Sequence, residues 1–331
     1  MTAFGTVFTP EMIISRYDES GWSAPEVVSS DSISLHPGAH VLHYSSTCFE
    51  GLKAFRHPDG SINIFRMDKN IQRMAQSSHL LSLPEIDKKQ LEQMIVQITA
   101  RFAADVPEPP GSMYIRPTHI GTEPAIGKAA APSTTSLLYV LLSPVGDYFS
   151  GGSTALRLLL REDGMRCAPH MGMIKSGGNY ASSLPSMMQA RSEVKADQVL
   201  YCPDGQVQET GAANFLLIDG NEVITRALDS TFLHGVTRDS VLTLARDLGM
   251  DVQERDLSIE ELLERSAKPE TEAALSGTAA VLAPVGTLIY EGKEYTVGSG
   301  QPGPMTSKLR QMMNDIQWGR SEDTHGWLTR V

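Results

Sequence analysis

The chain has 331 residues, of which 41% are hydrophobic and 20% are charged, so it is long enough for two domains and unlike a disordered protein. Its formal net charge of −11 argues against nucleic acid and anionic membrane surfaces as partners. The three scattered cysteines lack the spacing of a disulfide framework or a zinc site, and because neither a secretory signal nor a membrane-spanning run is evident, we expect a cytoplasmic protein.

The first part of the sequence predicts short strands followed by two helices. Residues 33–66 are typical of short strands separated by turns. A helix is expected over 68–81, with Asp68 as its N-cap, and a second helix over 86–104, because apolar residues recur at helical spacing. Two apolar runs then predict longer strands, at 113–117 and 135–144.

The second part of the sequence mixes strands and helices without a strict alternation, which indicates an α+β fold. A stretch rich in Gly, Pro and Ser divides the chain, so we expect a small N-terminal domain over 1–145, a linker over 146–155 and a large domain over 156–331. Strands are expected at 156–160, 198–202, 214–218 and 222–226. Helices are expected at 178–195, 236–248, 258–266 and 304–319.

Lys175 stands in the stretch MIKSGGNYASS, beside two glycines and just before a predicted helix. Glycines let the backbone turn tightly and approach a ligand, and a buried lysine amine can form a Schiff base with an aldehyde. An exposed lysine in a glycine-rich turn explains the motif equally well. The motif by itself therefore leaves both interpretations open.

Other polar residues have the chemistry to complement such a lysine. Glu209 precedes a buried strand, where its carboxylate can hydrogen-bond a pyridinium nitrogen and keep the ring an electron sink. Val236 and Thr237 begin an amphipathic helix whose N–H groups favour an anion. Thr278 lies in a short polar turn, and Arg66 can add a charge-assisted bond to a phosphate. Taken singly, each has an ordinary explanation as a helix cap, a polar turn or a surface arginine.

Taken together, six motifs resemble one known family, the branched-chain amino acid aminotransferases. They occur in the family's order: FEGLKAF (49–55), YIRPTHIGTEP (114–124), KSGGNYASS (175–183), QETGAANF (208–215), HGVTRDS (234–240) and SGTAA (276–280). The similarity runs from about residue 30 to residue 320. It implies the α+β type IV pyridoxal-phosphate fold, with a smaller N-terminal and a larger C-terminal α/β domain and the active site between them.

The resemblance also implies a role for each candidate residue. Lys175 would bind pyridoxal 5'-phosphate covalently and act as the catalytic proton shuttle. Cofactor contacts are implied for Arg66, Lys175, Tyr180, Glu209, Val236, Thr237 and Thr278. Substrate contacts are implied for Phe49, Tyr44, Tyr114, Arg116, Tyr148, Thr278 and Ala279. Within that set, Arg116 would accept the distal carboxylate of glutamate, and Tyr44 would act across the interface of a homodimer.

The implied reaction moves the amino group of L-leucine, L-isoleucine or L-valine to 2-oxoglutarate by a ping-pong mechanism. The partners are then small molecules, and no metal site is expected because the histidines lack a carboxylate cluster. Alternatives are a D-amino acid aminotransferase or an aminodeoxychorismate lyase of the same fold, which are usually shorter, or a catalytically inactive scaffold. The complete set of Lys175, Tyr180, Glu209 and Arg66 argues against the scaffold.

Three residues depart from the family's pattern. Lys128 stands where relatives often have an apolar residue, and it points either to solvent or toward acidic substrates. His170 lies either near the entrance of the active site or in a solvated loop, and Ala212 stands where a threonine is common. These departures leave open the preference among the three amino acids. The sequence also leaves open a biosynthetic or catabolic role, and a dimer or a higher oligomer.

Overall fold

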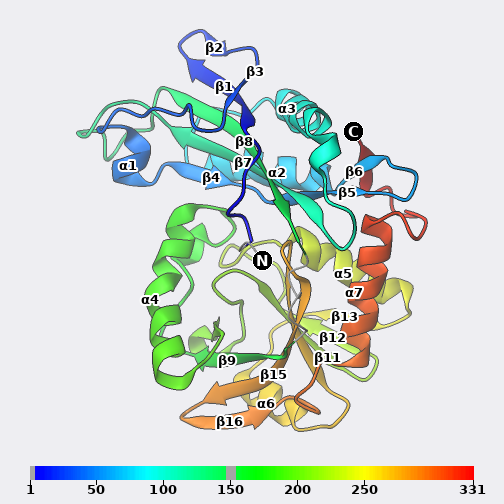
Figure 1. The fold of residues 1–331 in the computed structure, drawn as a ribbon. Coiled ribbons are helices and arrows are strands. Elements are labelled where there is room, and N and C mark those ends of the chain that lie inside the picture. Colours follow the sequence, from blue (N-terminus) through cyan, green and yellow to red (C-terminus); the bar gives the residue numbers. More distant parts are fainter. Residues whose placement is uncertain (1–3, 147–153) are drawn as a thin grey trace. The chain divides into compact units, whose positions relative to one another are not determined.

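The computed structural model describes residues 4–146 and 154–331, and the chain divides into two compact units (Figure 1). The first unit comprises Met1–Tyr148, Ile174–Gly177 and Ile316–Val331. The second unit comprises Phe149–Met173 and Gly178–Asp315. The chain thus returns to the first unit twice, which a division at one linker does not anticipate. Most of the expected linker over 146–155 lies outside the described residues, and the expected domain limits stay a prediction.

An antiparallel sheet forms the framework of the first unit. Its nine strands, counted over the described residues, are β1 Glu11–Asp18, β2 Gly21–Trp22, β3 Glu26–Ser29, β4 Thr47–Phe49, β5 Leu52–Arg56, β6 Ile62–Phe65, β7 Ser112–Gly121, β8 Ser136–Val145 and β17 Leu328–Arg330. Their order is β17-β6-β5-β7-β8-β1-β2, with β3 paired to β1 and β4 to β7. The long β7–β8 ladder runs from Ser112 opposite Val145 to Gly121 opposite Ser136, so it fixes which side chains of β7 share a face.

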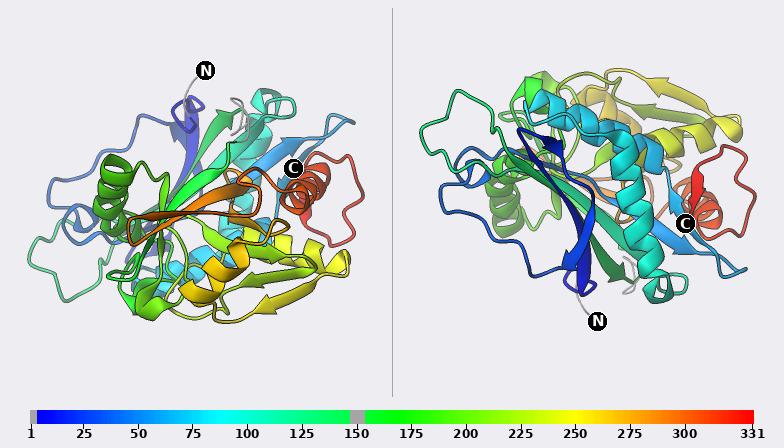
Figure 2. Two further views of the ribbon diagram at one scale, coloured as in Figure 1. Left: turned by 90° about the horizontal axis from the view of Figure 1, so that it is seen from below. Right: turned by 90° about the horizontal axis from the view of Figure 1, so that it is seen from above.

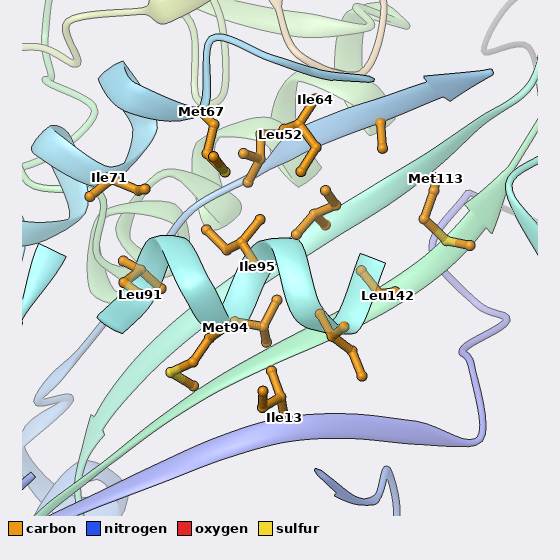
Figure 3. Packing of buried hydrophobic residues seen from close by; sticks show 14 of the residues in the cluster. Ile13, Leu52, Ile64, Met67, Ile71, Leu91, Met94, Ile95, Met113 and Leu142 are labelled. Carbon is orange, nitrogen blue, oxygen red and sulfur yellow. The ribbon is translucent and has the colours of Figure 1, made fainter. Parts of the chain in front are cut away.

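The helices of the first unit are α1 His40–Tyr44, α2 Met67–Leu80 and α3 Lys88–Arg101. Helix α3 lies along the sheet near β1 and β8 (Figure 2). Figure 3 shows the core that results, in which Leu91, Met94 and Ile95 of α3 pack among apolar residues from the strands and α2. Each such buried side chain contributes roughly 1.5–3 kcal/mol relative to leaving it in water. The Asp87 carboxylate caps α3 by accepting the N–H groups of its first turn.

A mixed sheet forms the framework of the second unit. Its eight strands, counted over the described residues, are β9 Leu156–Arg161, β10 Gln198–Tyr201, β11 Asn214–Asp219, β12 Glu222–Thr225, β13 Asp251–Glu254, β14 Glu272–Gly277, β15 Val281–Tyr290 and β16 Lys293–Thr296. Their order is β10-β9-β15-β14-β11-β12-β13, with β16 paired to β15. The pairs β10–β9, β9–β15 and β12–β13 are parallel, and the others are antiparallel.

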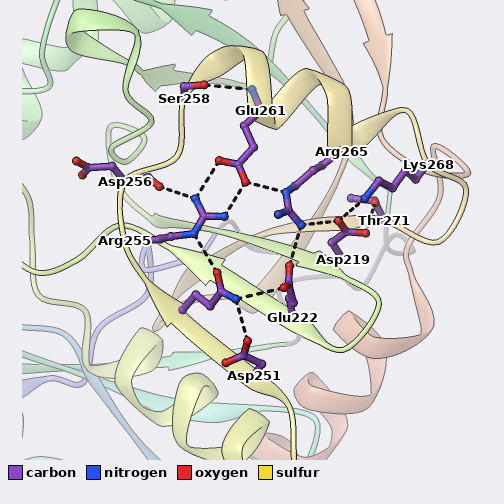
Figure 4. Close-up of polar contacts among 11 residues, drawn as sticks. Asp219, Glu222, Asp251, Arg255, Asp256, Ser258, Glu261, Arg265, Lys268 and Thr271 are labelled. Carbon is purple, nitrogen blue, oxygen red and sulfur yellow. Dashed lines mark hydrogen bonds and ion pairs between the residues drawn. The ribbon is translucent and has the colours of Figure 1, made fainter.

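The remaining helices are α4 Gly177–Val194, α5 Val236–Asp247, α6 Ile259–Ser266 and α7 Pro304–Gln317. The Ser258 hydroxyl caps α6 by accepting the N–H of Glu261 at 3.2 Å. Figure 4 shows the ion-pair network around this helix, in which Arg265 lies 2.6 Å from Asp219. The same network pairs Arg255 with Glu261 at 2.6 Å, so it ties α6 to the strands beneath it.

Most expected elements are confirmed, with two differences in the first unit. Helix α2 begins at Met67 with Arg66 as its N-cap, so the expected cap at Asp68 is wrong. The backbone N–H of Arg66 donates to the Trp327 carbonyl at 2.7 Å, a contact distant in sequence that fixes where α2 begins. The short helix α1 was not expected within 33–66. No helix in the described part of the chain is long and apolar enough to cross a membrane.

Candidate active site

Lys175 lies in the short segment that returns to the first unit. Its backbone N–H donates to the Ser77 hydroxyl of α2 at 3.1 Å, and its carbonyl accepts the N–H of Phe49 at 3.0 Å. A bridge between Cys48 and Ser176 extends this pairing with β4. The Lys175 backbone is therefore held from two elements, and its half-buried side chain places Nζ 5.1 Å from the centroid of the Phe49 ring.

Arg116 links two other predicted substrate residues of this unit, Phe49 and Tyr114, into one cluster. The guanidinium carbon of Arg116 lies 4.7 Å from the Phe49 ring centroid and 5.1 Å from the Tyr114 ring centroid. An Arg116 Nη2 hydrogen donates to the Tyr114 hydroxyl at 2.9 Å. Both residues lie on β7 two positions apart, so they share a face. This arrangement depends on Gly51, because a Cβ there would lie 1.9 Å from the Tyr114 hydroxyl oxygen.

Phe4, which belongs to none of the sequence motifs, packs on the same cluster. Its ring meets the Tyr114 ring edge-on, with the centroids 5.1 Å apart. The ammonium of Lys53 lies 5.9 Å from the Phe4 ring centroid. A single aromatic residue near the start of a chain belongs to no periodic pattern, so only the fold reveals that it lies beside the predicted substrate tyrosine.

Tyr44 and Lys128 belong to neighbouring parts of the first unit. The Tyr44 hydroxyl, at the end of α1, donates to the Ile126 carbonyl. Lys128 pairs with Glu123 at 2.5 Å, so its charge is engaged within this chain. Hydrogen bonds from Lys128 and from the Thr134 backbone lower the pKa of Glu123 to about 2. Tyr148, the other predicted substrate residue of this region, lies outside the described residues.

Arg66 is almost fully buried, with 4% of its surface exposed, so the interpretation as a surface arginine is wrong. Its backbone adopts a left-handed conformation with φ 53° at the start of α2. Its guanidinium carbon lies 5.1 Å from the Trp327 ring centroid. A buried arginine stacked on an indole is a cation held in a fixed place, as a phosphate contact requires.

Glu209 lies in the second unit and is also buried, with 3% of its surface exposed. One carboxylate oxygen, Oε1, accepts the N–H of Leu233 at 3.1 Å, and the other, Oε2, accepts an Nδ2 hydrogen of Asn214 at 3.2 Å. Arg166 Nε lies 2.6 Å from Oε1, although its N–H is not aimed at the oxygen, so the contact is an ion pair. Leu233 and Asn214 are donors and Arg166 is a cation, and these are the partners that suit an ionised carboxylate.

Arg166 likewise belongs to none of the sequence motifs. It is 2% exposed, and its Nη2 donates to the Gly172 carbonyl at 2.8 Å. Its guanidinium carbon lies 5.9 Å from the ring of Tyr180, a half-buried residue of α4. The available signal was general: a buried carboxylate needs a cation, and Arg166 stands between two apolar residues, a methionine and a cysteine. His170, in the same stretch, lies exposed.

The amino end of α5 is a candidate anion site. The helix begins at Val236 after Gly235, and no side chain caps it. The N–H groups of a first helical turn have no partner within the helix, and the helix dipole adds positive potential there. Val236 and Thr237 therefore present donors where an anionic group binds well.

The turn between β14 and β15 holds Thr278 and Ala279, both half-buried. Val281 follows in a left-handed conformation with φ 62°, which is strained for a β-branched residue. The Ser276 hydroxyl, at the start of the turn, is buried and has no hydrogen-bond partner among the described residues. A buried orphan hydroxyl beside a strained turn fits a bound polar group that completes its hydrogen bonding.

The described residues thus offer an amine, a buried carboxylate held by donors, a buried arginine and an uncapped helix end. They hold no group of three or more His, Cys, Asp or Glu side chains that suits a metal ion. Taken one by one, these groups match the separate parts of a carbonyl cofactor that has a basic ring nitrogen and an anionic tail.

The family profile for amino-transferase class IV matches residues 47–288. The chain belongs to this family. A probable branched-chain-amino-acid aminotransferase from Streptomyces coelicolor is 39% identical over 98% of this chain and 91% of its own. Branched-chain-amino-acid aminotransferase 2 from Bacillus subtilis is 36% identical over 99% of this chain and 92% of its own. The expected membership among branched-chain amino acid aminotransferases is confirmed.

Solved structures agree with the expected fold class. A T.th. branched-chain amino acid aminotransferase with pyridoxamine 5'-phosphate has a TM-score of 0.80 at 26% identity, covering 96% of this chain and 97% of that one. The branched-chain amino acid aminotransferase from Escherichia coli has a TM-score of 0.77 at 26% identity, covering 92% of this chain and 96% of that one. The α+β fold of this family is therefore confirmed.

Proposed function

We propose that this chain is a pyridoxal-phosphate-dependent transaminase that moves the amino group of L-leucine, L-isoleucine or L-valine to 2-oxoglutarate in a ping-pong cycle. The names of its relatives support the substrate class. The observation that carries the proposal is the position of Lys175, whose backbone is held by Ser77 and Phe49 and whose amine lies over the Phe49 ring. A lysine fixed at its backbone, with a half-buried amine, suits covalent catalysis.

When bound, pyridoxal phosphate supplies an aldehyde carbon that condenses with amines and a protonated ring that draws electrons. The Nζ atom of Lys175 holds the cofactor at rest and later moves a proton on and off the substrate Cα. The Glu209 carboxylate meets the ring nitrogen and keeps its proton in place. Tyr180 contacts the ring oxygen. Arg166 forms an ion pair with the Glu209 carboxylate, with its Nε 2.6 Å from Oε1.

The cofactor phosphate is assigned to four residues from different elements. Arg66 contributes a buried guanidinium. Val236 and Thr237 contribute the uncapped N–H groups of α5. Thr278 contributes its hydroxyl, and the β14–β15 turn in which it stands contributes backbone N–H donors. Their charge and their N–H donors suit a doubly charged anion.

The substrate pocket has to accept both an apolar side chain and the acidic side chain of glutamate. Phe49, Tyr114 and Tyr148 supply apolar and aromatic surface for the first. Arg116 supplies the charge for the second, because it stacks on two rings and forms no ion pair with any carboxylate in the described part of the chain. The turn at Thr278 and Ala279 binds the substrate α-carboxylate. An aromatic pocket with one such arginine suits both substrates.

We also propose a homodimer in which Tyr44 reaches the site of the second copy. Leu42 of the same helix and Ile126, whose carbonyl accepts the Tyr44 hydroxyl, are exposed by 59% and 68%. Two exposed aliphatic side chains around a tyrosine are typical of a subunit interface. Light scattering of the purified protein measures the mass directly, and a monomer with full activity would contradict this part of the proposal.

The central test is chemical trapping of the cofactor. Borohydride reduction followed by peptide mapping should place the label on Lys175, and Lys175→Ala should abolish both the label and glutamate formation. Lys69→Ala is the matched control, because Lys69 is exposed on α2. A donor screen with 2-oxoglutarate separates the rivals: activity on D-alanine without activity on L-leucine would identify a different enzyme of this fold. A label on another lysine would refute the assignment.

A further inference from the structure

A closed ring of hydrogen bonds joins Glu209, Asn214 and Leu233 in the second unit. The Asn214 amide nitrogen donates to Glu209 Oε2 at 3.2 Å and to the Leu233 carbonyl at 2.9 Å. The Leu233 N–H donates to Glu209 Oε1 at 3.1 Å, which closes the ring. The three residues are 3%, 5% and 9% exposed, so these bonds form away from water and an unmade one is costly.

The same amide also reaches the beginning of α5. Leu233 precedes Gly235, the N-cap of α5, by two residues, so its carbonyl belongs to the segment that leads into the helix. On the other side of the amide, a Cβ on residue 235 would lie 2.1 Å from Asn214 Oδ1. The Asn214 side chain therefore packs directly against the Gly235 backbone, and only glycine leaves room for it.

We propose that Asn214 is a positioning residue that fixes the Glu209 carboxylate and the amino end of α5 relative to each other. The Glu209 carboxylate, proposed to bind the cofactor ring, and the amino end of α5, proposed to bind its phosphate, are then held at a fixed distance from each other by one side chain. Such preorganisation strengthens binding, because the groups need no ordering when the ligand arrives. The inference rests on the proposed function, which assigns Glu209 to the ring nitrogen and the α5 amino end to the phosphate.

The chemistry of the ring requires asparagine. Aspartate has the same shape but no N–H donor, and it would place a second carboxylate 3.2 Å from the oxygen of Glu209. Alanine would leave Glu209 Oε2 and the Leu233 carbonyl without this donor. A longer side chain would meet the Gly235 backbone, which is already in close contact with Oδ1.

The test uses two probes that each occupy half of the cofactor site. The full-length apoenzyme is titrated with pyridoxal, followed by absorbance, and separately with inorganic phosphate, followed by calorimetry. Asn214→Ala should weaken both by about 10-fold, which corresponds to about 1.4 kcal/mol each. Asn214→Asp should weaken pyridoxal further. Asn221→Ala is the matched control, because Asn221 is exposed and its side-chain amide donates to the Gly249 carbonyl at 3.3 Å, outside the ring around Glu209.

A substitution on the helix side provides a second, independent arm. Gly235→Ala pushes the Asn214 amide from the opposite direction, so it should weaken pyridoxal as well as phosphate although residue 235 lies at the phosphate end. The inference would be overturned if Gly235→Ala left the affinity for pyridoxal unchanged. It would also be overturned if Asn214→Ala weakened the binding of only one probe, or bound both probes as well as Asn221→Ala does. A wild-type protein that binds neither probe would instead refute the proposed function. Should Asn214→Ala fail to fold, the isosteric Asn214→Asp carries the same comparison.

Discussion

Adding one methyl group at Gly51 tests whether the Tyr114 hydroxyl has to lie where the structure places it. The new Cβ would lie 1.9 Å from the hydroxyl oxygen and 2.8 Å from the ring carbon that bears it, and real Cβ contacts are essentially never below 3.0 Å. The Tyr114 ring therefore has to retreat by about 1 Å, the difference between 3.0 and 1.9 Å. Gly51 does not have a left-handed backbone, so alanine causes no further backbone strain there.

This retreat disturbs the predicted substrate residues and leaves the lysine contacts in place. The Arg116–Tyr114 hydrogen bond of 2.9 Å has to lengthen or break. A displacement of about 1 Å costs up to ~100-fold in rate, and overpacking a buried site costs roughly 1–3 kcal/mol of stability. We expect kcat/KM for L-leucine to fall about 100-fold in Gly51→Ala, with borohydride trapping at Lys175 unchanged.

Steady-state kinetics with L-leucine and with L-glutamate measure this effect, and thermal unfolding reports the packing cost. Gly164→Ala is the matched control, because a Cβ there meets nothing nearer than the Arg161 side chain at 4.0 Å. Adding Tyr114→Phe to Gly51→Ala removes the atom of closest contact but keeps the ring carbon at 2.8 Å, so stability should recover in part while activity does not. A Gly51→Ala enzyme with wild-type kcat/KM would refute the placement of Tyr114 in the substrate site.

Two further predictions concern stability. Glu50→Gln should lower the free energy of unfolding by roughly 3–5 kcal/mol in urea, because it removes the negative charge from a buried ion pair with Arg73 at 2.6 Å. Glu26→Gln, in an exposed pair, should change it by under about 0.5 kcal/mol, and equal effects would contradict this reasoning. Burial lowers the pKa of His119 to about 3, so the unfolded chain takes up its proton first as the pH falls below 6.5. The free energy of unfolding of the wild type should therefore fall between pH 6.5 and 3, with a slope of up to about 1.4 kcal/mol per pH unit from this group. His119→Gln should lack that component. If the two proteins lost stability in parallel as the pH fell, the assignment would be contradicted.

The elements that the sequence predicted are those whose signals are local. Helix α6 begins after Ser258, as its spacing to Glu261 indicates, and the apolar runs of β7 and β8 became the longest ladder of the first unit. The start of α2 was predicted at the wrong residue because the Trp327 carbonyl, far along the chain, binds the Arg66 N–H. A short helix such as α1 has too few residues to show a period.

The residues of the candidate site were also predicted where their signals in the sequence are local. Motifs named most of the residues proposed to touch cofactor or substrate, because those residues stand in compact and recognisable stretches. Arg66, Tyr44 and Tyr148 lie outside the six motifs. Arg166 and Asn214, which support Glu209, and Phe4, which packs on Tyr114, were not found. Their partners lie far away in sequence or are defined by side-chain direction, so only the folded chain identifies them.

The division of the chain into units separates two tasks of the proposed chemistry. Lys175 is held by Ser77 and Phe49 of the first unit, although Met173 and Gly178, close to it in sequence, belong to the second. Glu209 contacts Leu233, Asn214 and Arg166, all of the second unit. These bonds and the two bonds that hold the Lys175 backbone have no residue in common. A substitution of a residue that holds Lys175 should therefore leave the hydrogen bonds of Glu209 intact, and the reverse should also hold. A loss of cofactor binding can then be assigned to one unit by the substitution that causes it.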